Sequence, residues 1–185
     1  MNTKADKFFK VVYDIYGTYL DSIMGYYHFR NFLIYSQGKN PPPDIDNRKF
    51  TYGKGNPGEV GSYKLQESTQ GEVKERNKDE GKNDQIIGNL CLVSIYGYWE
   101  YFRGKIAEEK GISINDIKSD LMADIAKIRH SILKHDSVGN EKMKRCKILK
   151  WFKEGEKIYI DQRKMEEVVF FIRKFVDELN REYYS

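Results

Sequence analysis

The stretch SINDIKSDLMADIAKIRHSILKH, residues 113–135, carries the clearest structural pattern in the chain. Its large aliphatic residues recur at steps of three and four, which is the spacing of an amphipathic helix. These residues are Ile114, Ile117, Leu121, Ile125, Ile128 and Ile132. Ser113 followed by Asp116 is a helix-start signature, so we expect this helix to begin at Ser113. The next step of three places His135 on the same stripe, at the edge of the predicted bundle.

Three further segments show helical spacing of apolar residues. They run from about Ala5 to Gln37, from about Asp84 to Lys110 and from about Lys164 to Glu182. The second contains an aromatic block whose helical spacing favours core packing over base stacking. Its members are Tyr96, Tyr98 and Trp99.

Two short apolar runs precede the last helix. KILKWF (147–152) and KIYI (157–160) flank Glu154 and Gly155, a combination typical of a short hairpin. The predicted fold class is therefore all-α, an antiparallel helical bundle with a long loop between the first two helices and a small β-hairpin before the last.

The segment 38–82 differs in composition from the rest of the chain. It contains all four prolines, seven of the fifteen glycines and only seven apolar residues. We expect a single domain over 1–185 in which 38–82 is a polar insertion loop rich in Gly and Pro. The G-x-G-x-x-G string at 53–58 lies inside it, and the composition around it favours a loop over a nucleotide-binding site.

Composition indicates a cytoplasmic protein without a membrane span or a secretion signal. No apolar run approaches the roughly 20 residues that a span requires, and the first residues lack a signal-peptide pattern. Cys91 and Cys146 are too few for a disulfide framework. The net charge is +4, and residues 121–160 hold ten Lys and Arg against five Asp and Glu. This excess favours a polyanionic partner such as RNA, with a solvated basic face as the alternative.

Arg129, His130 and His135 suggest a chemistry at the end of this helix. RNA supplies its own nucleophile, the 2′-hydroxyl; an imidazole can transfer the proton and a guanidinium can bind the phosphate. A capped helix end with solvent-facing side chains is the alternative. His135 and Asp136 also form the His-Asp pair of metal phosphohydrolases, but no companion ligands are evident. We therefore expect no metal and no cofactor.

The run from Ile128 to His135 resembles the signature of the HEPN superfamily. In that signature an Arg, usually followed by Asn, Asp or His, precedes a His by four to six residues; here five residues separate Arg129 from His135. The upstream Tyr-Trp-Glu block, residues 98–100, and the order of elements over 147–182 are also similar to members of this superfamily. The resemblance covers about residues 83–182.

The resemblance implies a helical bundle that forms a homodimer, with two motif helices meeting across a two-fold axis. It also implies metal-independent endoribonuclease activity that leaves a 2′,3′-cyclic phosphate and a 5′-hydroxyl. Such proteins commonly act as toxins, antiphage effectors or RNA-processing factors, so a cognate antitoxin or a defence-system protein is an expected kind of partner. The alternative is a non-catalytic HEPN-like module that binds RNA or protein.

Under this hypothesis Arg129 stabilises the transition state, His135 transfers the proton and His130 orients both. Glu100 is a secondary candidate, although Arg103 at i+3 favours a structural ion pair with it. Four basic residues are expected to follow the RNA backbone. They are Lys134, Lys142, Lys144 and Arg145.

Overall fold

The computed structural model describes residues 3–56 and 58–184. The chain forms two compact units. The first combines the residues up to Asp21 with those from Gln85 onward, and the second comprises Ser22–Asp84. Helix α1 (Lys4–Ser36) begins in the first unit and ends in the second.

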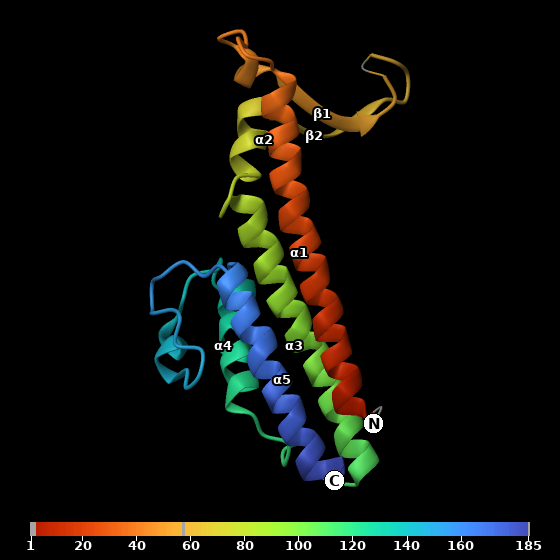
Figure 1. The fold of residues 1–185 in the computed structure, drawn as a ribbon, viewed down its shortest axis with the longest axis vertical. Coiled ribbons are helices and arrows are strands. Elements are labelled where there is room, and N and C mark those ends of the chain that lie inside the picture. Colours follow the sequence, from red (N-terminus) through yellow and green to blue (C-terminus); the bar gives the residue numbers. More distant parts are fainter. Residues whose placement is uncertain (1–2, 57, 185) are drawn as a thin grey trace. The chain divides into compact units, whose positions relative to one another are not determined.

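The first unit is a bundle of the N-terminal part of α1 and three further helices, as the sequence predicted. They are α3 (Lys82–Lys110), α4 (Asp120–Lys134) and α5 (Gln162–Tyr184). Figure 1 shows α4 and α5 alongside α3. Asn89, near the start of α3, donates a hydrogen bond to Ser137, just beyond the end of α4, so these two helices run antiparallel. The expected bounds of α1, α3 and α5 are confirmed to within about two residues.

Three aromatic rings hold α1, α3 and α5 together. Phe8 lies 5.5 Å from Trp99, and Trp99 lies 5.1 Å from Phe175, measured between ring centroids. All three side chains are buried. Burying each of them stabilises the fold by about 2 kcal/mol, and the tilted and edge-on contacts add to this. The packing role predicted for Trp99 is confirmed, whereas Tyr98 is 46% exposed and its assignment to the core was wrong.

Helix α4 begins at Asp120 and not at Ser113 as expected. The side chain of Ser119 accepts a hydrogen bond from the backbone N–H of Met122 at 3.2 Å and caps the helix. Ser113 and Asp116 close only a single turn, in which the N–H of Ser113 donates to the carboxylate of Asp116. Apolar spacing continues across the cap, because Ile117 and Leu121 are both buried, and periodicity therefore does not reveal the break.

The hairpin predicted before α5 does not form, and Asp124 is one reason. This carboxylate is fully buried on α4. Its Oδ2 accepts the backbone N–H groups of Lys147, Ile148 and Leu149 at 2.8, 2.6 and 3.0 Å. The first predicted strand is thus hydrogen-bonded to a side chain instead of to a second strand.

The second predicted strand is held by Asn89 and by the chain that follows α4. Asn89 donates to the carbonyl of Ile158 and accepts the N–H of Ile160. The only bridge in this part of the described chain joins Lys157 to Val138, antiparallel. The two apolar runs therefore do not pair with each other, and their backbone groups bond to the buried side chains of Asp124 and Asn89 and, at Ile158, to the carbonyl of Ser137.

The second unit contains regular structure where a polar loop was expected. Its elements are a 3₁₀ turn at Ile45–Asn47, β1 (Lys49–Lys54), β2 (Tyr63–Thr69) and α2 (Gln70–Arg76). The strands pair antiparallel, and Thr69 and Glu72 form a capping box at the start of α2. Most residues of both strands are exposed, whichever face of the sheet they lie on. The sequence therefore shows no alternation of apolar and polar residues from which the strands could be predicted.

The hairpin also accounts for the glycine string. A Cβ on Gly53 would lie 2.5 Å from the carbonyl oxygen of Tyr63, and Gly55 has a φ of +76°. A side chain at the first position would collide with the partner strand, and one at the second would be strained. The expectation that this string is no nucleotide fingerprint remains consistent with its place in a hairpin.

Within the described residues, none of the helices combines the length and apolar character needed to cross a membrane.

Candidate functional site

Helix α4 brings the three motif residues to one end. His135 is its C-cap, with φ −132° and ψ 33°, and its backbone N–H donates to the carbonyl of Ser131. The next two residues, Asp136 and Ser137, have positive φ values of 50° and 58°. The chain therefore turns sharply after the helix, and His135 projects from it as an exposed side chain instead of continuing the apolar stripe.

His130, His135 and Lys142 converge at this end. The Nε2 atom of His130 lies 3.3 Å from Nε2 of His135 and 3.4 Å from Nζ of Lys142. An ammonium group has only donors, so the contact with Lys142 requires a lone pair on Nε2 of His130. With the proton of His130 on Nδ1, the single lone pair on its Nε2 can accept from Lys142 or from an Nε2–H of His135.

The surroundings of His130 favour its neutral form. Partial burial lowers the pKa of His130, and so do the positive charges of Lys142, His135, Lys134 and Arg129. His130 is therefore neutral at pH 7 and can act as a hydrogen-bond acceptor toward its neighbours.

Arg129 lies on a different side of α4 from this cluster of imidazoles. Its guanidinium carbon is 5.2 Å from the centroid of the Tyr96 ring on α3, and the side chain is half-buried. Its Nε is buried and has no hydrogen-bond partner among the described residues. The charge of Arg129 still reaches the motif, since it contributes to the lowered pKa of His130. A guanidinium that no carboxylate among the described residues pairs with is suited to binding an anion.

Glu100 is exposed on α3 and does not join the histidines. No ion pair links it to Arg103 in the described chain, so the expected pairing is not present. Burial and the charge of Glu100 raise the pKa of Tyr96, while Arg129 and Arg103 oppose this rise. Glu100 therefore lies near the aromatic partner of Arg129 and not beside the imidazoles.

The four predicted RNA-binding cations are divided by the structure. Lys142 joins the histidines, and Lys134 is close enough to lower the pKa of His130. Lys144 instead forms an ion pair with Glu154 at 2.6 Å. Arg145 is exposed and is the last residue of the 3₁₀ turn Glu141–Arg145, which also contains Lys144.

Asp124 is a positioning residue that the sequence analysis missed. By fixing the N–H groups of residues 147–149 it anchors the end of the basic segment that carries Lys142. Burial raises its pKa, but hydrogen bonds from Lys127 and from the N–H groups of Ile148 and Leu149 outweigh this and lower the pKa overall. The sequence does place Asp124 three residues after Leu121 and four before Ile128, on the apolar face of the helix. A carboxylate at such a position needs a partner, and this could have identified it.

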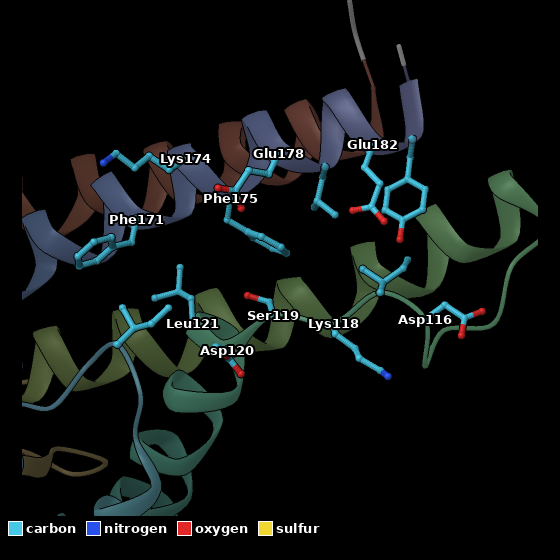
Figure 2. A pocket seen from close by; sticks show the side chains of 14 residues that line it. Asp116, Lys118, Ser119, Asp120, Leu121, Phe171, Lys174, Phe175, Glu178 and Glu182 are labelled. Carbon is cyan, nitrogen blue, oxygen red and sulfur yellow. The ribbon is translucent and has the colours of Figure 1, made fainter.

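A cavity of about 490 Å³ lies elsewhere in the first unit, between α5 and the chain leading into α4 (Figure 2). None of the residues predicted for the site lines it. Its rim carries the carboxylates of Asp116, Glu178 and Glu182, which disfavour a phosphate. Over residues 3–56 and 58–184, no three His, Cys, Asp or Glu side chains gather as ligands for a metal ion.

Comparison of the chain with protein-family models, with curated proteins and with solved structures finds no match. The resemblance to the HEPN superfamily therefore stands on the motif and the Tyr-Trp-Glu block alone, because the hairpin that it implied before α5 does not form.

Proposed function

We propose that this chain is a metal-independent endoribonuclease that acts as a homodimer. The observation that carries the proposal is the convergence of His130, His135 and Lys142 within 3.4 Å at the end of the helix that also bears Arg129. The two imidazoles supply a proton acceptor and a proton donor, and Lys142 supplies a phosphate ligand beside them, while Arg129 lies on another side of the same helix end.

In the proposed reaction the nucleophile and the leaving group both belong to the RNA, and the protein supplies proton transfer and charge stabilisation. The 2′-oxygen attacks the adjacent phosphorus and loses its proton to His135. The bond from phosphorus to the 5′-oxygen breaks, and that oxygen receives the proton that His135 accepted. The products are a 2′,3′-cyclic phosphate and a 5′-hydroxyl. His130 holds the ring of His135 through their shared hydrogen bond, and Arg129 stabilises the charge that develops on the phosphate oxygens.

Exposed apolar side chains near the motif support the dimer. Leu133, between His130 and His135, is 50% exposed, and Val138 follows the motif at 38%. Ile86 and Leu90 on α3 are 47% and 52% exposed. Residue 89, between them, contacts the turn after α4, so these side chains lie at the same end of the bundle. A second copy that covers them would bring two motifs together.

Cleavage of a generic single-stranded RNA in EDTA tests the activity. We expect His135→Ala to reduce the rate about 10²- to 10⁴-fold, because it removes the proton-transfer group. Arg129→Ala is expected to reduce the rate about 10²-fold or more. We expect a single-stranded DNA of the same sequence to stay intact, because it lacks the attacking 2′-hydroxyl.

His28→Ala is the matched control. This third histidine is exposed on α1 and contacts only the ring of Tyr27 among the described residues, so its loss leaves cleavage unchanged. Circular dichroism establishes that all variants are folded, and light scattering reports the dimer. A folded dimer that binds RNA and never cuts it would favour the non-catalytic binding module. Activity that disappears in EDTA would indicate a metal-dependent phosphohydrolase. A role as a toxin or defence effector, with its antitoxin or partner protein, follows only if RNA is cut.

A further inference from the structure

A second cavity, of about 460 Å³, lies between α3 and the first half of α4. Arg103, Tyr96 and Trp99 line it from α3. The chain entering α4 contributes Lys118, and Ala123 and Ala126 form part of the opposite wall. We call this space the α3–α4 groove.

The groove is positively charged. Arg103 and Lys118 are its two cations, and Asp120 is its one carboxylate. Asp120 is already engaged, since it accepts a hydrogen bond from Lys147 at 2.8 Å. Arg103 has a buried Nε without a hydrogen-bond partner among the described residues. No carboxylate among the described residues pairs with Arg103, so the charge of its guanidinium is available to an anionic ligand in the groove.

The groove leads to the motif. Tyr96 lines the groove and also lies under the guanidinium of Arg129, whose Nε is likewise buried and unpartnered among the described residues. Ala126 on the wall precedes Arg129 by three residues, so both lie on the side of α4 that carries the contact with Tyr96. The small alanine side chains leave the space open, and its volume is within the range of sites for small organic ligands.

We propose that the α3–α4 groove binds the nucleotide next to the cleaved position of a single-stranded RNA. Its phosphate contacts Arg103 and Lys118, and its base lies along Tyr96. The choice of RNA as the ligand rests on the proposed function, whereas the groove, its charge and its unused donor do not.

The side chain of Lys118 is better placed to bind a ligand in this groove than one in the cavity of Figure 2. It lines both spaces, but Figure 2 shows its side chain directed away from Phe175 and Glu182. The carboxylates on that side would repel a phosphate, and none of them lines the α3–α4 groove.

Binding of a single-stranded oligonucleotide with 2′-O-methyl groups tests the subsite, because such an oligonucleotide cannot be cleaved. Fluorescence anisotropy is measured with the full chain over a range of salt concentrations. We expect Arg103→Ala and Lys118→Ala each to raise Kd about tenfold, the loss of one charged hydrogen bond. Each should also reduce the slope of log K against log salt by about 0.7, the loss of one phosphate contact.

Two further variants separate this from other effects. Lys105→Ala removes the same charge from the same helix, but Lys105 pairs with Glu108 and does not line the groove, so the slope stays as in the wild type. Ala123→Trp fills the groove without changing charge and should weaken binding as much as Arg103→Ala.

The results distinguish the two proposals. The subsite is refuted if the wild type does not bind the oligonucleotide, or if Arg103→Ala and Lys105→Ala have the same affinity and slope. Binding that depends on Arg103, without cleavage of unmodified RNA, would retain the subsite and reject the nuclease. If the wild type cleaves RNA and Arg103→Ala leaves KM and Kd unchanged, the nuclease is retained and the subsite is rejected.

Discussion

At the scale of single residues, the structure depends on buried polar groups placed on apolar helix faces. Asp124 is fully buried and accepts four hydrogen bonds, three from backbone N–H groups and one from Lys127. An uncompensated carboxylate at this depth would be strongly destabilising, so these bonds are what permit its burial. Because they also fix the segment beyond Lys142, the same residue supports both stability and the site.

Asp124→Asn should lower the free energy of unfolding by about 3 kcal/mol at pH 7. An amide would direct its NH₂ group at Lys127 or at the backbone N–H groups of residues 147–149. The pKa of Asp124 is lowered in the folded state, so its contribution is fully present above the unfolded value of about 4 and is lost as the pH falls toward the folded value. Urea unfolding at pH 7 and pH 3 measures this, and the difference between wild type and variant should shrink at pH 3.

Asp120→Asn is the control for this prediction. Asp120 is an exposed carboxylate on the same helix, paired with Lys147, and such pairs contribute about 1 kcal/mol or less. Equal losses in the two variants would contradict the role given to Asp124.

At the scale of elements, the sequence predicts helices well and their boundaries less well. Helices α1, α3 and α5 follow from apolar spacing, because each buries apolar side chains at steps of three and four over part of its length. The start of α4 was misplaced because Ser113 and Ser119 both have the side chain of a cap. The hydroxyl of Ser119 accepts the N–H of Met122 within α4, whereas that of Ser113 accepts the N–H of Asn115 in the preceding turn. The hairpin was predicted wrongly because periodicity does not show that Asn89 and Asp124 bind the backbone of both strands.

Two glycines of α3 make a matched test of how closely this helix packs. A Cβ on Gly88 would lie 1.9 Å from the carbonyl oxygen of Ile160, a backbone atom, while one on Gly97 would meet nothing within 4 Å. We expect Gly88→Ala to destabilise the protein by about 2–3 kcal/mol, because α3 and the segment held by Asn89 must separate. Gly97→Ala should stabilise it by up to about 1 kcal/mol through helix propensity. Thermal unfolding measures whether each substitution lowers or raises stability. A Gly88→Ala variant as stable as the wild type would refute the close approach of Gly88 to Ile160.

At the scale of the whole molecule, the candidate site is partly local and partly tertiary. Arg129 and His130 lie within α4, where helical spacing fixes their relative positions, whereas the contact of His130 with His135 depends on the chain leaving the helix at its C-cap, which spacing does not show. The groove residues Tyr96 and Arg103 lie on α3 and Lys118 on the chain that enters α4, so their proximity depends on how α3 and α4 pack. The second unit was missed because its strands bury little apolar surface, and burial is what sequence patterns report.

The two compact units should open independently, and hydrogen–deuterium exchange measures this. The β1–β2 ladder is exposed on both faces, so its amides should exchange through openings of about 2 kcal/mol or less. Amides of α4 around Ile125 and Ile128, which are fully buried, should exchange only near the global free energy, about 5–15 kcal/mol. Asp124→Asn should then accelerate exchange in α4 about a hundredfold and leave the ladder unchanged, because the lost hydrogen bonds belong to the first unit alone. An equal acceleration in both would mean that the chain unfolds as one cooperative structure, and the division into two units would have no energetic counterpart.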